Sequence, residues 1–134
     1  MAATTHAYPT RAYRDTEVLT ADPHHQVVLL FDTMVRDLHT ASAAMAQGDH
    51  HAQCSNIVHT QRILAALTAA LDEGPAPELA EALYSLYNWL HAKLTEASLA
   101  DDQPLLTEVT GIITSLRDAW RQAEAHCRGE GSRL

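Results

Sequence analysis

The chain has 134 residues, of which 46% are hydrophobic but only 5% aromatic, and its formal net charge is −8. A chain of this length can bury a substantial core, and its abundance of Ala and Leu favours helices over strands. Nucleic-acid binding is excluded, because it needs a concentrated positive surface and the nine Lys and Arg residues are scattered. There is no long apolar run and no signal-peptide pattern near the N-terminus, so we expect a soluble, cytoplasmic protein without membrane insertion.

The N-terminal residues 1–19 show no sustained helical stripe, and we expect a flexible arm there, or at most a short extra helix. The first long helix is predicted to begin at Pro23, with Asp22 as its cap. It ends at Gly48, since glycine tolerates a left-handed cap. Its apolar face consists of Val27, Leu30, Phe31, Met34, Leu38, Ala41 and Met45, with Val28 and Val35 beside it.

The second helix is predicted to be capped by Asp49 and to end before the sequence Asp-Glu-Gly-Pro-Ala-Pro at 72–77. Its core face is predicted to comprise Cys54, Ile57, Leu64, Leu67 and Leu71.

The third helix is predicted to start at Pro77, and it carries more apolar surface than one helix contact needs. One stripe contains Leu79, Leu83, Leu86, Leu90, Leu94 and Ala97, and a second ridge beside it contains Tyr84, Tyr87 and His91. The ridge either packs inside a bundle or lines a groove for another chain. The periodicity alone leaves both explanations open.

The fourth helix is predicted to be capped by Asp102, and residues 129–134 are predicted to be a frayed tail. Its main apolar line contains Leu105, Val109, Ile112, Leu116, Ala119 and Ala123, and a second line contains Leu106, Ile113 and Trp120. Gly111 interrupts this helix, which indicates either a close helix crossing or the backbone of a partner. Residues 20–128 are therefore predicted to form an all-α domain, an antiparallel up-down four-helix bundle.

Residue spacing argues against catalysis and metal binding. The nine histidines include no His-x-x-x-His or Glu-x-x-His pattern, which a ferritin-like metal bundle would need. Cys54 and Cys127 are far apart and are expected to be separate thiols. No Gly-rich phosphate loop is present. We therefore predict no catalytic residue, no metal and no cofactor, and a protein that is not an enzyme.

The remaining feature is the surplus of apolar positions on the long helices. Such a surface is covered either by an amphipathic helix of a partner or by self-association of the bundle. The second alternative is a structural homodimer.

A series of sequence blocks resembles, in order, the FliS family of flagellar export chaperones. These blocks span about Tyr13–Ala123 and are Leu19–Pro23, Leu29–Asp32, Leu38–Ala41, Thr60–Leu64, Leu67–Asp72, Leu83–Leu90, Leu94–Ser98 and Glu108-Val109 with Leu116–Trp120. Each block alone is an ordinary amphipathic helix segment, and the series together carries the resemblance.

The resemblance implies a cytoplasmic bundle that binds the flexible C-terminal segment of flagellin. Such a chaperone prevents premature polymerisation and hands its client to the flagellar export apparatus, and the client becomes helical as it binds. It also implies that an N-terminal tyrosine can occupy the apolar surface before the client arrives; Tyr13 matches this tyrosine best, and Tyr8 is the other candidate. The client-contact candidates are Tyr13, Ile57, Leu64, Leu67, Tyr84, Tyr87 and His91. Internal packing is the alternative for Ile57, Leu64 and Leu67, and a homodimer without a flagellin client is the alternative function.

Overall fold

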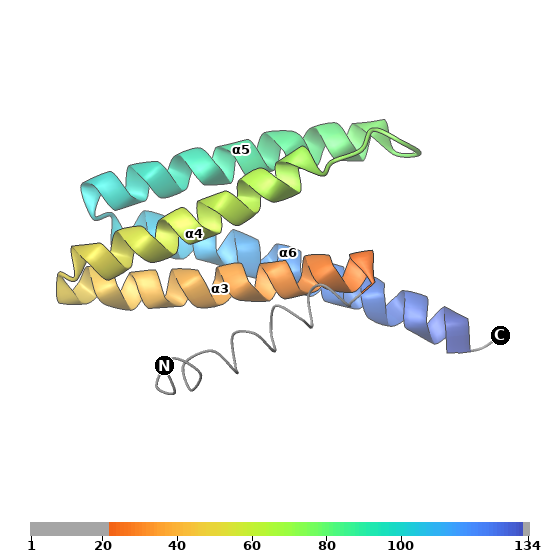
Figure 1. Cartoon of the computed structure of the whole chain (residues 1–134), viewed down its shortest axis with the longest axis horizontal. Coiled ribbons are helices and arrows are strands. Elements are labelled where there is room, and N and C mark those ends of the chain that lie inside the picture. Colours follow the sequence, from red (N-terminus) through yellow and green to blue (C-terminus); the bar gives the residue numbers. More distant parts are fainter. Residues whose placement is uncertain (1–21, 133–134) are drawn as a thin grey trace, which may run out of the picture.

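The computed structural model describes residues 22–132 of the chain, and helices account for most of this range. They are α3 (Pro23–Gln47), α4 (His50–Ala69), α5 (Pro77–Ala100) and α6 (Gln103–Ser132). Successive helices run in alternating directions and pack against one another, and α6 closes the arrangement against α3 (Figure 1). The predicted all-α antiparallel bundle is confirmed. The arm predicted at residues 1–19 lies outside the described residues.

The predicted caps set the helix boundaries at the start of α3 and at the connection between α3 and α4. The carboxylate of Asp22 accepts a hydrogen bond from the backbone N–H of His25 at 2.9 Å, and Pro23 occupies the first turn. Gly48 ends α3 in the left-handed region, with φ of 73°, which glycine adopts without steric cost. Asp49 then caps α4 by accepting from the backbone N–H of Ala52.

The connection between α5 and α6 is held by a buried amide from α4. Gln53 Nε2 donates to Asp101 Oδ1 at 2.9 Å and to the backbone oxygen of Ser98 at 3.2 Å. Asp101 has a φ of 49°, a conformation that Asp tolerates better than most residues. Asp102 caps α6 through a hydrogen bond from the backbone N–H of Leu105. The two-residue connection is thereby tied to the start of α4.

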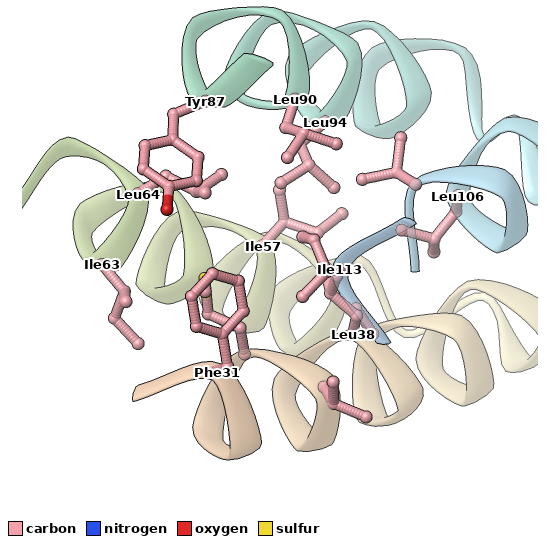
Figure 2. Close-up of a cluster of buried hydrophobic side chains, with 14 of the residues drawn as sticks. Phe31, Leu38, Ile57, Ile63, Leu64, Tyr87, Leu90, Leu94, Leu106 and Ile113 are labelled. Atoms are coloured by element: carbon pink, nitrogen blue, oxygen red, sulfur yellow. The ribbon is translucent and has the colours of Figure 1, made fainter. Parts of the chain in front are cut away.

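The core lies between all four helices, as Figure 2 shows. Its largest fully buried apolar side chains are Phe31, Met34 and Leu38 from α3, Ile57 and Leu64 from α4, Leu90 and Leu94 from α5, and Leu106, Val109 and Ile113 from α6. Close packing of this kind makes each of these positions sensitive to a change in side-chain volume.

The predicted core face of α4 was wrong at its start. Cys54 is exposed, and the buried polar residues Gln53 and Thr60 occupy core positions instead. Gln53 enters the core because its amide finds partners at the end of α5. A buried polar side chain is stable where such partners exist.

Both apolar lines predicted for the fourth helix contribute to the core, except at the alanines near the C-terminal end of the first line. Leu106 and Ile113, assigned to the second line, are buried, whereas Ala119 and Ala123 from the main line are exposed. Gly111 lies at no close crossing, since a Cβ built there would meet nothing within 4 Å. Helix α6 continues to Ser132 and extends past the other helices (Figure 1).

Polar contacts fix α6 along α3. Arg121 donates to Asp32 Oδ1 at 2.7 Å, and Arg117 lies 3.8 Å from the same oxygen. His25 Nδ1 and Glu124 Oε1 are 2.8 Å apart. These contacts all lie on the α3–α6 side of the bundle, away from the surface between α4 and α5.

Candidate binding site between α4 and α5

A hollow of about 340 Å³ lies on the surface between the second half of α4 and the first half of α5. We call it the α4–α5 hollow, and its lining residues are Leu64, Ala65, Thr68, Ala69, Tyr84, Tyr87, Asn88 and His91. The two helices lie side by side here and join through the turn at the upper right of Figure 1.

The hollow exists because small side chains of α4 face large ones of α5. Ala65, Thr68 and Ala69 follow one another at helical spacing and project little beyond the backbone. Tyr84 and His91 on α5 lie seven residues apart, which places them on one helix face. The side chain of Tyr84 is 56% exposed, so a large aromatic surface remains open to another molecule.

The floor of the hollow is part of the bundle core. Leu64 is fully buried and Tyr87 is only 2% exposed. The Tyr87 ring packs at a tilt against Phe31, with ring centroids 6.5 Å apart, and Figure 2 shows both rings between the helices. Burial raises the pKa of the Tyr87 hydroxyl, and a hydrogen bond with the Trp120 side chain partly offsets this effect. The floor is therefore rigidly supported from α3 and α6.

Hydrogen bonds fasten α4 to α5 at one end of the hollow. Gln61 Nε2 donates to the backbone oxygen of His91 at 3.0 Å and to the hydroxyl of Thr95 at 2.7 Å. On the α5 side, Asn88 Nδ2 donates to the backbone oxygen of Tyr84 at 2.9 Å. The apolar walls thus lie between a polar bridge at one end and the α4–α5 turn at the other.

The structure brings together four of the predicted contact residues: Leu64, Tyr84, Tyr87 and His91 all line the hollow. Ile57 and Leu67 belong to the buried core and are not among the lining residues. Tyr13 lies outside the described residues.

Four lining residues, Ala65, Thr68, Ala69 and Asn88, were missed because small and polar residues carry no hydrophobic periodicity. Their signal in the sequence is the row of small side chains on α4 opposite an aromatic ridge.

Metal-ligand clusters and membrane-spanning helices are both absent from the described residues. Within residues 22–132, no group of three or more His, Cys, Asp and Glu side chains is placed to hold a metal ion. None of the helices in the same range combines the length and the apolar character needed to cross a membrane.

The fold and the site define a protein of the helical-bundle class that presents an apolar interhelical hollow. Residues 4–126 match the sequence model of the family described as "Flagellar protein FliS". The chain therefore belongs to the FliS family.

Curated relatives from several bacteria support the assignment. The flagellar secretion chaperone FliS of Bacillus subtilis is 29% identical over 115 residues, covering 86% of this chain and 85% of the relative. The corresponding protein of Salmonella typhimurium is 29% identical, with 89% of both chains covered. FliSB of Pseudomonas aeruginosa is 30% identical, covering 79% of this chain and 84% of the relative. A secretion chaperone has a non-enzymatic role, in agreement with the prediction that this chain is not an enzyme.

A crystal structure described as a flagellar chaperone from bacteria has the same fold. It superimposes with a TM-score of 0.72 at 13% sequence identity and covers 87% of this chain and 98% of its own. The likeness confirms the bundle architecture.

Proposed function

We propose that the chain is a cytoplasmic export chaperone that binds the disordered C-terminal segment of flagellin. Binding would prevent premature polymerisation and aid delivery to the flagellar export apparatus. Membership of the FliS family supports this role. The structural observation in its favour is the α4–α5 hollow with its exposed Tyr84, which we propose as the place where the client binds.

The chemistry of the hollow suits a segment that folds as it binds. A disordered client loses chain entropy when it becomes ordered, so its partner must offer apolar surface in compensation. The hollow provides apolar walls from Ala65, Ala69 and Tyr84 over a supported floor. An amphipathic helix laid into an interhelical groove is a common way to use such a surface.

The predicted contact residues take different parts in this proposal. Tyr84 and His91 are exposed at the hollow and would touch the client directly. Leu64 and Tyr87 form the floor, while Ile57 and Leu67 would support it from the core. Tyr13 keeps the role that the family resemblance implies, as the arm residue that covers the apolar surface before the client arrives.

The proposal is tested by titration calorimetry of the full chain against a peptide of the C-terminal segment of the host flagellin. Circular dichroism of the mixture should show more helix than the sum of the separate components, because the segment orders on binding. One-to-one binding with this gain of helix supports the proposal. A folded protein that releases no binding heat at micromolar concentrations would overturn it.

The homodimer alternative rests on other exposed apolar side chains of α5. Leu79 is 59% exposed and Leu99 is 83% exposed, and neither residue lines the hollow. Light scattering after size-exclusion chromatography, without peptide, separates the alternatives. A dimer mass that resists dilution would favour self-association, whereas a monomer leaves these residues as ordinary exposed side chains.

A further inference from the structure

Charges around the α4–α5 hollow are segregated by sign along its length. Asp72 and Glu73 follow α4 at the turn, and Glu81 lies three residues before Tyr84 on α5; all three are exposed. Residues three apart share a helix face, so Glu81 borders the Tyr84 wall. No Lys or Arg occurs between Arg62 and Lys93, and the turn end of the hollow is therefore acidic.

The opposite end carries the nearest cation and a hydrogen-bonding ring. Arg62 is exposed and lies three residues before the lining residue Ala65, on the same face of α4. His91 lines that end of the hollow. Lys93 is engaged elsewhere, 3.0 Å from Glu96 and 5.8 Å from the centroid of the Trp89 ring, and neither of these partners lines the hollow.

This polarity would distinguish the two directions in which a helix can dock. A helix carries partial positive charge at its N-terminus and partial negative charge at its C-terminus. With its N-terminus at the turn, a bound helix would place free N–H groups near Asp72, Glu73 and Glu81. Its terminal carbonyls would then lie near Arg62 and His91, side chains of the kind that bind helix C-termini. The reverse direction places like charges together at both ends.

We propose that the client helix docks parallel to α5, with its N-terminus at the α4–α5 turn. This inference rests on the proposed function and adds the direction of the bound segment. It also specifies the chemistry of the occupant, an amphipathic helix without acidic side chains in its first turn, since those would face Asp72, Glu73 and Glu81.

Cys54 provides a reference point for measuring the direction. It is exposed on α4, with its Sγ 3.8 Å from the hydroxyl of Ser98 on α5, so it lies beyond Arg62 as seen from the turn. A helix rises about 1.5 Å per residue, which puts Cys54 roughly 20 Å along α4 from Ala69. Since the chain has two cysteines, Cys127→Ser leaves a single thiol for a spin label.

The experiment measures electron–electron distances between the label on Cys54 and a second label at either end of the flagellin peptide. We expect the C-terminally labelled peptide to give the shorter distance, by roughly 10 Å for a helix that spans the hollow, whose longer wall runs from Tyr84 to His91. A shorter distance from the N-terminal label, or equal populations of both, would overturn the proposed direction while leaving the proposed function intact. A folded chain that does not bind the peptide would overturn both.

Charge reversal gives an independent measurement. Glu81→Lys should weaken peptide binding by roughly two- to five-fold at low salt, and the loss should shrink as salt screens the charges. The matched control is Glu108→Lys, which makes the same change at an exposed position on α6 and should bind as the wild type does. If the wild type, Glu81→Lys and Glu108→Lys bind the peptide with equal affinity and have the same helix content, the inference is contradicted.

Discussion

Tyr84 and Tyr87 lie one turn apart on α5, yet they occupy opposite environments. Tyr87 is 2% exposed and packs against Phe31 in the core, whereas Tyr84 is 56% exposed at the wall of the hollow. The same aromatic ridge of the sequence therefore supplies one residue to the fold and one to the surface. Substitutions at these two positions separate stability from binding.

Replacing the exposed ring should affect the client and leave the fold intact. Tyr84→Ala is expected to weaken peptide binding about ten-fold or more, equivalent to about 1.4 kcal/mol. The free energy of unfolding should change by less than about 0.5 kcal/mol, as is usual at exposed positions. Calorimetry and urea denaturation measure the two quantities.

Trp89→Ala is the matched control for Tyr84→Ala, because Trp89 is an aromatic residue of the same helix, 40% exposed and outside the hollow. It should leave the affinity for the peptide unchanged. Equal losses of affinity in the two variants would show that the hollow is not the docking surface.

Ionisation of Tyr87 should lower the stability of the bundle at alkaline pH. Burial raises the pKa of this hydroxyl in the folded state above its ordinary value of about 10. The contribution of the neutral Tyr87 hydroxyl to the free energy of unfolding is therefore complete below about pH 10. It is lost as the pH rises through the folded-state pKa, because the unfolded chain releases the proton more readily. Tyr87→Phe should flatten the decline of stability above pH 10 in urea denaturation. An identical decline in wild type and variant would contradict this assignment.

Gly111 is an exposed glycine inside α6, where a Cβ would meet nothing within 4 Å. Gly111→Ala should therefore raise the free energy of unfolding by about 1 kcal/mol, through the higher helix propensity of alanine. Chemical denaturation provides the test, and a destabilised variant would contradict the open environment described for this position. Reduced peptide binding by the stabilised variant would show instead that a partner backbone passes there.

Thr60 places a hydroxyl in the core without a hydrogen-bond partner among the described residues. A buried hydroxyl without a partner costs free energy, and valine has nearly the same shape. Thr60→Val should thus stabilise the bundle by about 1 kcal/mol. Thr60→Ser, which keeps the hydroxyl but removes a methyl group, should be less stable than the wild type. A loss of stability in the valine variant would indicate that the hydroxyl does find a partner.

The sequence predicted the helix boundaries well where a cap is a local event. Asp22, Gly48, Asp49 and Asp102 act through neighbouring backbone groups, so their roles follow from the residues beside them. The core faces were predicted less well. Gln53 enters the core because its amide meets the end of α5. A hydrogen-bond partner so far along the chain cannot be recognised from the hydrophobic periodicity of α4.

The candidate site shows the same division. The aromatic ridge on α5 was visible from its spacing, but the position of Tyr87 in the core depends on the angle at which α5 packs against α4 and α6. The α4 wall was not predicted, because Ala65 and Ala69 shape the hollow through the volume they leave empty. Helix packing decides whether an apolar position faces inward or lines a groove. The periodicity of a single helix does not contain this information.

Nuclear magnetic resonance of the isotope-labelled chain, titrated with the flagellin peptide, reports residue by residue whether the client binds in the α4–α5 hollow. We predict that backbone amide signals of 64–69 and 84–91 shift as the peptide saturates the protein, since those residues form both walls. Saturable binding that leaves both segments unshifted would contradict binding in the hollow and would place the client on another face of the bundle.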